Sequence, residues 1–173
     1  MGFDLYGQNK NSPTGEYFRN NVWWWRRLAD FVINETGVVD EKDADGWHEN
    51  GGHKVSADEA EQIANQLEYL ISTGRVQEYA KEVQEKISRA EETNKKVQEK
   101  FDKLQERAIA ETKEDKIIPR DYPEHLKAEW NNLWEERDNN ENYPFALENV
   151  KEFIAFCRES KGFRICWLTY SKK

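Results

Sequence analysis

The chain has 173 residues, the length of one ordinary domain or of a domain with an extension. Charged residues make up 35% of it and its net charge is -8. This acidic balance argues against a general nucleic-acid binder, because such proteins gain affinity by neutralising phosphates with Lys and Arg. Trp, Tyr and Phe still account for 13% of the residues. Since buried aromatic side chains remove much area from water, we expect a compact aromatic core beside a long solvated element.

Cys157 and Cys166 are the only cysteines, too few for a disulfide framework and without the spacing of a zinc site. Their number is typical of reduced core thiols in a cytoplasmic protein. The start of the chain lacks the basic and apolar regions of a signal peptide, and no apolar run approaches the ~18 residues of a membrane span. We therefore expect a protein of the cytoplasm that does not contact a membrane.

The first 20 residues are rich in turn formers, and the apolar segment 3–6 predicts one brief strand. A helical pattern follows over 21–36, with Trp24, Leu28 and Phe31 or Val32 on one face and Gly37 as its stop. On a helix, the side chains of the three successive tryptophans 23–25 point in directions that span roughly 200° around the axis. At least one of them must therefore meet a neighbouring helix, a partner or a ligand.

An acidic loop is expected over 40–45, and the glycines of 46–54 predict irregular structure there. The next helix has a clear start signal. Ser56 and Glu59 form a capping-box pattern, which predicts a helix that begins at Ala57 and that Gly74 ends or kinks.

From 75 to 114 the chain consists mostly of helix formers and charges, and its apolar positions follow a heptad. Asn94 falls at an a position, where a buried Asn often sets register and oligomeric state. Three arrangements fit this pattern: self-association through the seam, antiparallel packing on residues 124–137 of the same chain, or a solvated helix. The proposed oligomer seam consists of Val83, Ile87, Asn94, Val97, Phe101 and Leu104.

A proline-punctuated connector over 117–123 precedes a helix with Leu126, Trp130, Leu133 and Trp134 on one face. Residues 139–142 should break that helix, and another should run from near Pro144 to Gly162. The segment 163–170 has strand composition and is a candidate to pair with residues 3–6.

Together these elements predict a mainly α fold with a small terminal β pairing, in which a compact helical core carries one long, charged, heptad-patterned helix. We expect a single domain over 1–173, with the arm 75–114 inserted in a core formed by 1–74 and 117–170.

The leading candidate site is an aromatic and basic pocket. Aromatic faces stack on bases, and Arg binds phosphate in a bidentate manner. Glycines before a helix N-terminus, as in 50–54, also favour an anion. The predicted ligand-binding residues are Tyr6, Arg19, Asn20, Trp24, Arg26, His53 and Lys54. The alternative is that the tryptophans form the core, while Arg26 and Arg27 are solvated or paired with Asp30.

No catalytic signature is present, and no cofactor or metal is predicted. His48 and His53 with Asp45 or Glu49 match no standard metal-ligand spacing. Glu49 with either histidine could form a general acid/base pair, although no nucleophile accompanies it in a recognisable order.

Several segments resemble a set of small uncharacterised proteins of bacteriophages and bacteria. These are 1–7 (MGFDLYG), 15–26 (GEYFRNNVWWWR), 52–60 (GHKVSADEA) and 153–166, whereas the charged helix is not part of the likeness. In that set a proline usually follows the tryptophan run, where this chain has Arg27. The resemblance implies no known reaction, but it suggests a phage-type accessory protein that counters a host defence.

Three functions follow as hypotheses. The first is a non-enzymatic protein that binds a small anionic or nucleotide-like ligand. The second is a protein-interaction inhibitor of a host protein, which acts through its acidic surface and coiled-coil-like helix. The third is a small hydrolase that uses Glu49 and His53.

Overall fold

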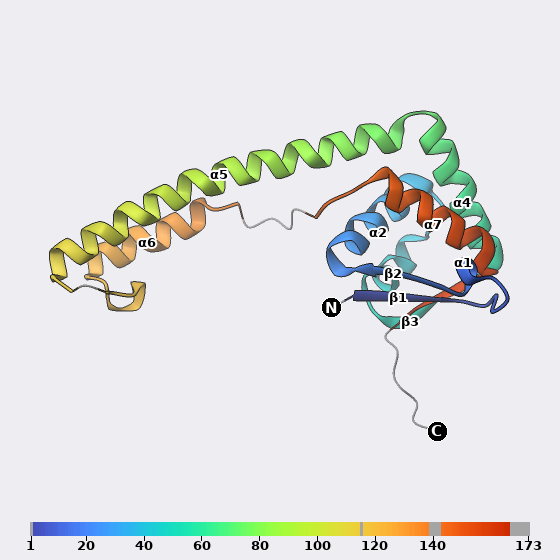
Figure 1. Cartoon of the computed structure of the whole chain (residues 1–173), viewed down its shortest axis with the longest axis horizontal. Helices are drawn as coiled ribbons and strands as arrows, with labels where there is room; N and C mark the ends of the chain where they lie inside the picture. Colours follow the sequence, from blue (N-terminus) through green and yellow to red (C-terminus); the bar gives the residue numbers. More distant parts are fainter. Residues whose placement is uncertain (1, 115, 139–142, 167–173) are drawn as a thin grey trace, which may run out of the picture. The chain divides into compact units, whose positions relative to one another are not determined.

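The computed structural model describes residues 2–114, 116–138 and 143–166 and has a mainly α fold with one small antiparallel sheet (Figure 1). The predicted fold class is therefore confirmed. The chain divides into two compact units, one of residues 1–84 and 143–173 and one of residues 85–142. We expected residues from 117 onward to join the core of 1–74. The contacts instead group residues 116–138 with residues 85–112 of the long helix, whereas residues 143–166 belong to the first unit.

The sheet of the first unit has the strand order β2-β1-β4-β3, and all its neighbours are antiparallel. Its strands are β1 (Gly2–Gly7), β2 (Tyr17–Asn21), β3 (Gly51–Val55) and β4 (Phe163–Cys166). The expected pairing of the two ends of the chain is confirmed, with Leu5 opposite Ile165. The rest of the predicted terminal strand, 167–170, and the predicted helix break at 139–142 lie outside the described residues.

Two stretches expected to be irregular are ordered. The acidic segment forms the short helices η1 (Glu41–Asp43) and α3 (Ala44–His48), and β3 follows them. The prediction that the glycines of 46–54 prevent regular structure is therefore wrong. Gly52 has a φ of 92° and lies at a register shift between Gly51 and His53, so this glycine forms a bulge within a paired strand.

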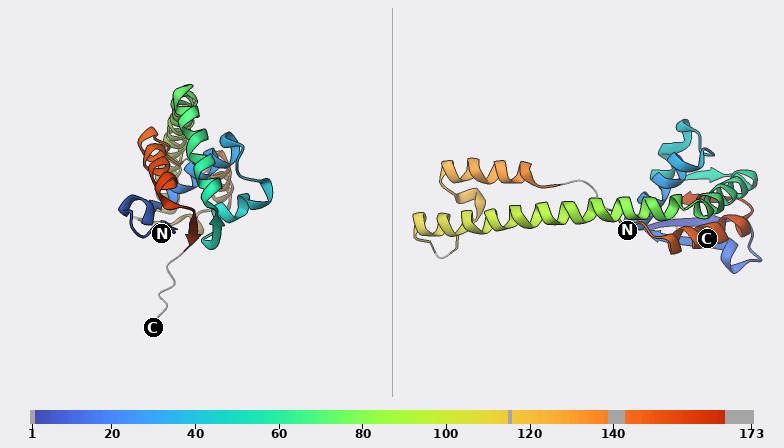
Figure 2. Two further views of the ribbon diagram at one scale, coloured as in Figure 1. Left: turned by 90° about the vertical axis from the view of Figure 1, so that its right-hand side faces the viewer. Right: turned by 90° about the horizontal axis from the view of Figure 1, so that it is seen from above.

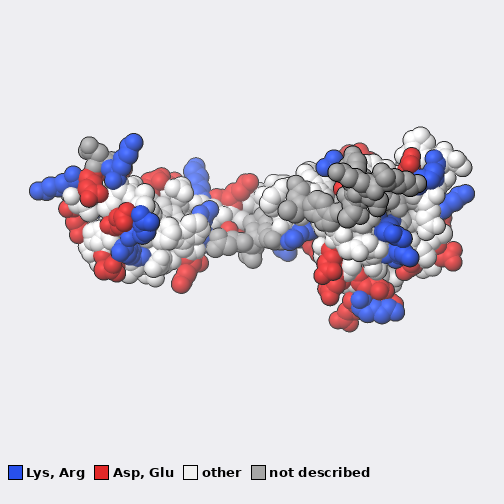
Figure 3. All heavy atoms as spheres, turned by 90° about the horizontal axis from the view of Figure 1, so that it is seen from below, with Lys and Arg blue, Asp and Glu red and all other residues white. Residues whose placement is uncertain are grey.

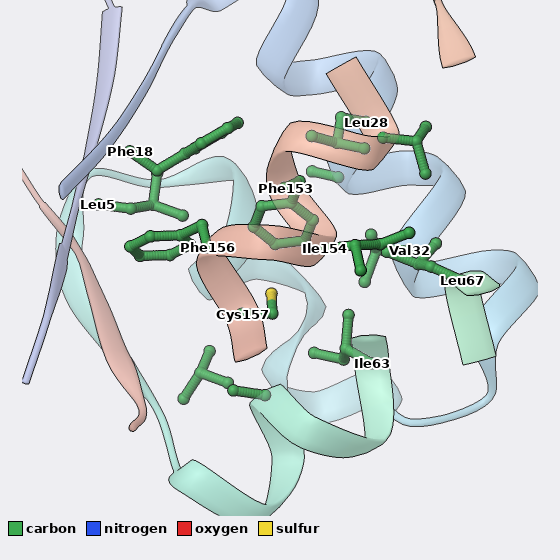
Figure 4. Packing of buried hydrophobic residues seen from close by; sticks show 14 of the residues in the cluster. Leu5, Phe18, Leu28, Val32, Ile63, Leu67, Phe153, Ile154, Phe156 and Cys157 are labelled. Atoms are coloured by element: carbon green, nitrogen blue, oxygen red, sulfur yellow. The ribbon is translucent and has the colours of Figure 1, made fainter. Parts of the chain in front are cut away.

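Besides η1 and α3, the first unit contains the helices α1 (Pro13–Glu16), α2 (Val22–Thr36), α4 (Ala57–Ser72) and α7 (Leu147–Ser160). Side chains from α2, α4 and α7 meet Leu5 and Phe18 of the sheet in one hydrophobic core (Figure 4). The capping box at Ser56 is formed as predicted, and α4 begins at Ala57. Gly37, with a φ of 67°, ends α2 as expected.

The phase of α2 differs from the prediction by one residue. Trp25, rather than Trp24, is fully buried, and its ring stacks on Trp47 with centroids 5.8 Å apart. Asn21 caps the helix by accepting a hydrogen bond from the backbone N–H of Trp24. Trp24 is half-buried and Trp23 is 55% exposed, so one tryptophan does face outward as the helix geometry requires.

The long helix α5 (Arg75–Thr112) begins in the first unit and continues into the second. There it forms an antiparallel hairpin with η2 (Pro119–Asp121) and α6 (Glu124–Glu136), as Figure 1 and the right-hand view of Figure 2 show. Asn94 exchanges two hydrogen bonds with the backbone of Asp138. Farther along α5, Arg107 pairs with Glu129, 2.7 Å away. The reversed order of these partners establishes the antiparallel direction.

The heptad seam is covered in the second unit by the protein's own chain. Val97 and Leu104 are buried with Leu126 and Leu133, and Phe101 packs against this cluster. Val83 is also buried, and Ile87 is half-buried. Of the three arrangements considered, the structure shows packing on 124–137, so self-association through Val97, Phe101 and Leu104 would have to displace α6. In the described residues no helix is long and apolar enough to cross a bilayer.

Candidate functional site

The sheet has one face under the helices and one open face. Along β1, Phe3 and Leu5 are buried in the core, whereas Asp4 and Tyr6 point the other way and are only partly covered. Side chains alternate between the two faces of a strand, so the residues paired with Asp4 and Tyr6 share their face. The open face is therefore built from alternate residues of all four strands.

Cross-strand pairing places a row of polar and aromatic side chains across this face. Tyr6 lies between Tyr17 of β2 and Arg164 of β4, and Arg164 in turn lies beside Lys54 of β3. The rings of Tyr6 and Tyr17 are in contact, with centroids 5.2 Å apart. Figure 3 shows the molecule of Figure 1 from below, and both basic and acidic side chains are visible on this side of the sheet-containing unit. The row thus joins an aromatic pair to a cationic end.

A cavity of about 470 Å³ opens at the cationic end of the row. Its lining includes Tyr6, Gly7, Gln8, Lys10, Lys54 and Arg164. The described residues that line it contribute three cationic side chains and no carboxylate. The aliphatic part of the Arg164 side chain lies beside Gly52: a Cβ added to Gly52 would be 3.8 Å from Cδ of Arg164. This size and charge suit a small anionic ligand.

The loop that carries Gln8 and Lys10 is fixed to the end of α7. The backbone N–H groups of Gln8 and Asn9 both donate to the carbonyl of Ser160, at 2.9 Å each. The side chain of Asn9 donates to the carbonyl of Glu159. A Cβ on Gly7 would lie 1.8 Å from the carbonyl oxygen of Gly15, so only glycine allows this close approach. The wall of the cavity that carries Lys10 is therefore held by backbone contacts.

A second row of side chains on the open face, beside the first, contains a carboxylate that is paired with an arginine. Arg19 lies opposite Asp4, with Nε 3.6 Å from Oδ1, and the hydroxyl of Tyr17 donates to the same carboxylate. Partial burial and this hydrogen bond raise the pKa of Tyr17 to about 12. Asp4 thus pairs with Arg19 and Tyr17. In the described part of the chain, Lys54 and Arg164 form no ion pair.

The structure brings only some of the predicted ligand residues together. Tyr6 and Lys54 line the cavity, and Arg19 shares the open face. His53 has the opposite orientation to Lys54, because neighbouring residues of a strand point to opposite faces. Its ring packs on the backbone of Gly46, where a Cβ would lie 2.5 Å from Nδ1. His53 therefore does not complete an anion site with Lys54.

The remaining predicted ligand residues lie elsewhere in the first unit. Asn20 donates to the side chain of Asn149 on α7 at 3.0 Å. Arg26 lies over the ring of Tyr143, 5.9 Å from its centroid. Trp24 is on α2 and half-buried. These residues do not line the 470 Å³ cavity, so the expected pocket between residues 1–27 and the 46–56 loop is not assembled as a unit.

Sequence reasoning missed Lys10 and Arg164. Arg164 had a usable signal, because Phe163 to Cys166 alternate between apolar and other residues and so predict an outward arginine in a half-buried strand. Lys10 had none, since its position depends on the contacts of the loop with α7.

The described histidines do not belong to a cluster that could bind a metal ion. His48 lies 3.2 Å from Asp30 on α2, and His125 lies 3.2 Å from Glu111 in the second unit. Across residues 2–114, 116–138 and 143–166 there is no group of three or more His, Cys, Asp or Glu side chains that could hold a metal ion.

The two cysteines are 2% exposed (Cys157) and half-buried (Cys166), and both are unoxidised thiols. Burial raises the pKa of each thiol, which disfavours the reactive thiolate.

Comparisons of the chain with protein-family models, with curated proteins and with solved structures found no match.

Proposed function

We propose that the protein is a non-enzymatic binding protein that takes up a small anionic, nucleotide-like ligand on the open face of its sheet. The observation that carries this proposal is the convergence of Lys10, Lys54 and Arg164 around Tyr6 in a chain whose net charge is -8. Local positive charge in an acidic protein is the feature that an anion would recognise.

Two kinds of contact would hold such a ligand. Lys54 and Arg164 would donate charge-assisted hydrogen bonds to a phosphate, and the planar guanidinium would do so in a bidentate manner. The tyrosine pair would offer an aromatic surface to a base. The cavity volume of about 470 Å³ is in the range of small-molecule sites.

The biological setting of the proposal rests on the sequence resemblance alone. We propose a phage-type accessory protein that acts in the host cytoplasm and counters a host defence by sequestering the ligand.

The proposal is tested first by native mass spectrometry of the full chain, compared with the same sample after denaturation. We expect a bound mass of nucleotide class that is lost on unfolding. Isothermal titration with ADP as the probe then maps the site. We expect Lys54→Met and Arg164→Gln each to lower the affinity by about tenfold to a hundredfold, because each removes a charge-assisted hydrogen bond worth about 1.5–3 kcal/mol.

The matched control is Lys151→Met, which removes the same charge from an exposed position on α7. It should leave ADP affinity unchanged. Absence of both a co-purified ligand and ADP binding would refute the proposal, and so would equal losses in the control and in the two cavity variants.

A further inference from the structure

The second unit carries an aromatic groove that is separate from the cavity on the sheet. It consists of two hollows, of about 270 and 410 Å³, that share Pro119 and Trp130. We call this feature the Trp130 groove. The first hollow is lined by residues of α5 and α6, including Phe101 and Trp134, and the second includes Arg120, Lys127 and Asn131. Because the two hollows share Pro119 and Trp130, they are adjacent. A ligand that fills both must extend past the side chain of Trp130 and is therefore elongated.

Aromatic rings dominate the first hollow. Phe101, Trp130 and Trp134 contact one another with centroid distances of 5.4 to 5.9 Å. Trp134 remains 39% exposed. Tyr122 closes the floor, and its hydroxyl donates to Gln105. The hollow thus presents aromatic surfaces held in place by their neighbours.

Hydrogen-bond donors accompany these rings. In the described part of the chain, the indole N–H groups of Trp130 and Trp134 and the side-chain amide of Asn131 form no hydrogen bond. Gln98 uses one amide hydrogen to donate to Asp102 at 2.9 Å. A ligand that covers the groove must offer acceptors to such donors, because a donor buried without a partner is costly.

A polyproline II segment can pack on the aromatic rings of the groove and can also offer acceptors to its hydrogen-bond donors. It has no internal hydrogen bonds, so its backbone carbonyls are available as acceptors. Its proline rings pack on aromatic faces, and its backbone is ordered before binding, which lowers the entropic cost. An α-helical ligand fits less well, since its carbonyls are already used within the helix.

Charge specifies the ligand further. The guanidinium of Arg137 lies over the ring of Trp134, 4.7 Å from its centroid, and lines the first hollow. Within the described residues Arg137 forms no ion pair, whereas Lys127 of the second hollow is paired with Glu124 at 2.8 Å. The same hollow is also lined by Asp102, which accepts a hydrogen bond from Gln98. A carboxylate on the ligand would therefore have Arg137, beside Trp134, as its cationic partner in this hollow.

We propose that the Trp130 groove binds a proline-rich segment of a partner protein in the polyproline II conformation, with an acidic residue next to Arg137. This interaction uses residues of the second unit only and is independent of ligand binding on the sheet. It supplies a specific surface for contact with a host protein.

The test is fluorescence anisotropy of the full chain with a fluorescein-labelled peptide, Pro-Pro-Pro-Glu-Pro-Pro-Pro, and with its Glu-to-Lys counterpart. We expect saturable binding of the Glu peptide with an affinity on the order of 10–100 μM and weaker binding of the Lys peptide. Trp134→Ala should weaken binding of the Glu peptide about tenfold or more, because it removes an anchoring aromatic side chain. Arg137→Gln should abolish the preference for Glu over Lys.

The matched control is Trp23→Ala, which removes an exposed tryptophan from the first unit and should bind the Glu peptide as the parent chain does. Far-UV circular dichroism checks that each variant is folded. If Trp134→Ala fails to fold, Arg137→Gln still decides the matter, since Arg137 is at the end of α6 and outside the buried cluster. No saturable binding up to about 1 mM, equal losses in the control, or an unchanged Glu preference in Arg137→Gln would overturn the proposal.

Discussion

Trp23 and Trp25 are two positions apart on α2 and lie in opposite environments. Trp25 is fully buried, stacks on Trp47 and Phe3, and donates its indole N–H to the carbonyl of Trp47 at 2.8 Å. Trp23 is 55% exposed and contacts the ring of Tyr143. Membership of the tryptophan run therefore says little about the role of each residue.

This contrast predicts different effects on stability. Trp25→Ala should lower the free energy of unfolding by about 3–5 kcal/mol, because it removes a large buried side chain and leaves the carbonyl of Trp47 without its donor. Trp23→Ala should lower it by roughly 1 kcal/mol or less. Urea denaturation followed by circular dichroism measures both values. Equal costs would contradict the burial described here.

At the scale of elements, an ion pair ties the end of α2 to the start of α5 in the first unit. Arg75 donates from Nε and Nη2 to the two carboxylate oxygens of Glu35, at 3.0 and 2.7 Å. Gly74, with a φ of 83°, ends the preceding turn and lets α5 begin at Arg75. The pair is about three-quarters buried at both side chains, so it is protected from solvent better than an ordinary surface pair.

A pH dependence of stability follows from this pair. The hydrogen bonds from Arg75 hold the pKa of Glu35 below its ordinary value of 4.5. A carboxyl with a lowered pKa stabilises the fold above that value, and its contribution is lost as the pH falls through 4.5 toward the pKa of the folded state. Glu35→Gln should cost about 1 kcal/mol at pH 7 and flatten the fall in stability below pH 4.5.

Urea denaturation at a series of pH values from 7 to 3 measures this effect. Glu152→Gln is the control, because Glu152 is an exposed carboxylate on α7 that forms no ion pair in the described residues. A pH profile of Glu35→Gln that parallels the parent chain would show that the pair contributes no pH dependence.

At the scale of the whole molecule, the described residues form two hydrophobic clusters rather than one. The first unit contains the larger cluster, in which Leu67 is fully buried, and the second contains the cluster around Leu104. The long helix α5 is the element that belongs to both units. Whether the chain unfolds as a single domain, as its length suggested, depends on how strongly α5 couples the two clusters.

Hydrogen exchange distinguishes unfolding of the whole chain as one domain from separate unfolding of the two units. Leu104→Ala should destabilise the second unit by about 2–5 kcal/mol, because it leaves a cavity beside Leu126 and Leu133. We expect the amides of residues 97–108 and 126–133 to lose protection while those of α4 keep theirs. Leu67→Ala in α4 should have the reverse effect. Equal loss of protection throughout in either variant would mean that the chain unfolds as one cooperative domain.

Local signals in the sequence determined several elements correctly. The Ser56 capping box, the glycine stops at 37 and 74 and the charged heptad over 75–112 depend on residues a few positions apart, so a short window contains the physics that decides them. The mainly α class followed from the same kind of pattern, and so did the expected pairing of 3–6 with 163–170, which the structure shows between residues 5–7 and 163–165.

Tertiary structure alone decided which of these elements meet. Burial of Trp25 rather than Trp24 depends on the partner Trp47, and β3 forms in a glycine-rich segment because β4 supplies its hydrogen bonds. The candidate cavity joins Lys10, Lys54 and Arg164, which are far apart in the chain. Strand register places Lys54 beside Arg164, and the contacts of its loop with α7 place Lys10. The heptad seam was compatible with several partners, and the geometry of the hairpin selected α6. A sequence specifies local backbone preferences directly, whereas the choice among long-range partners depends on the packing of the whole fold.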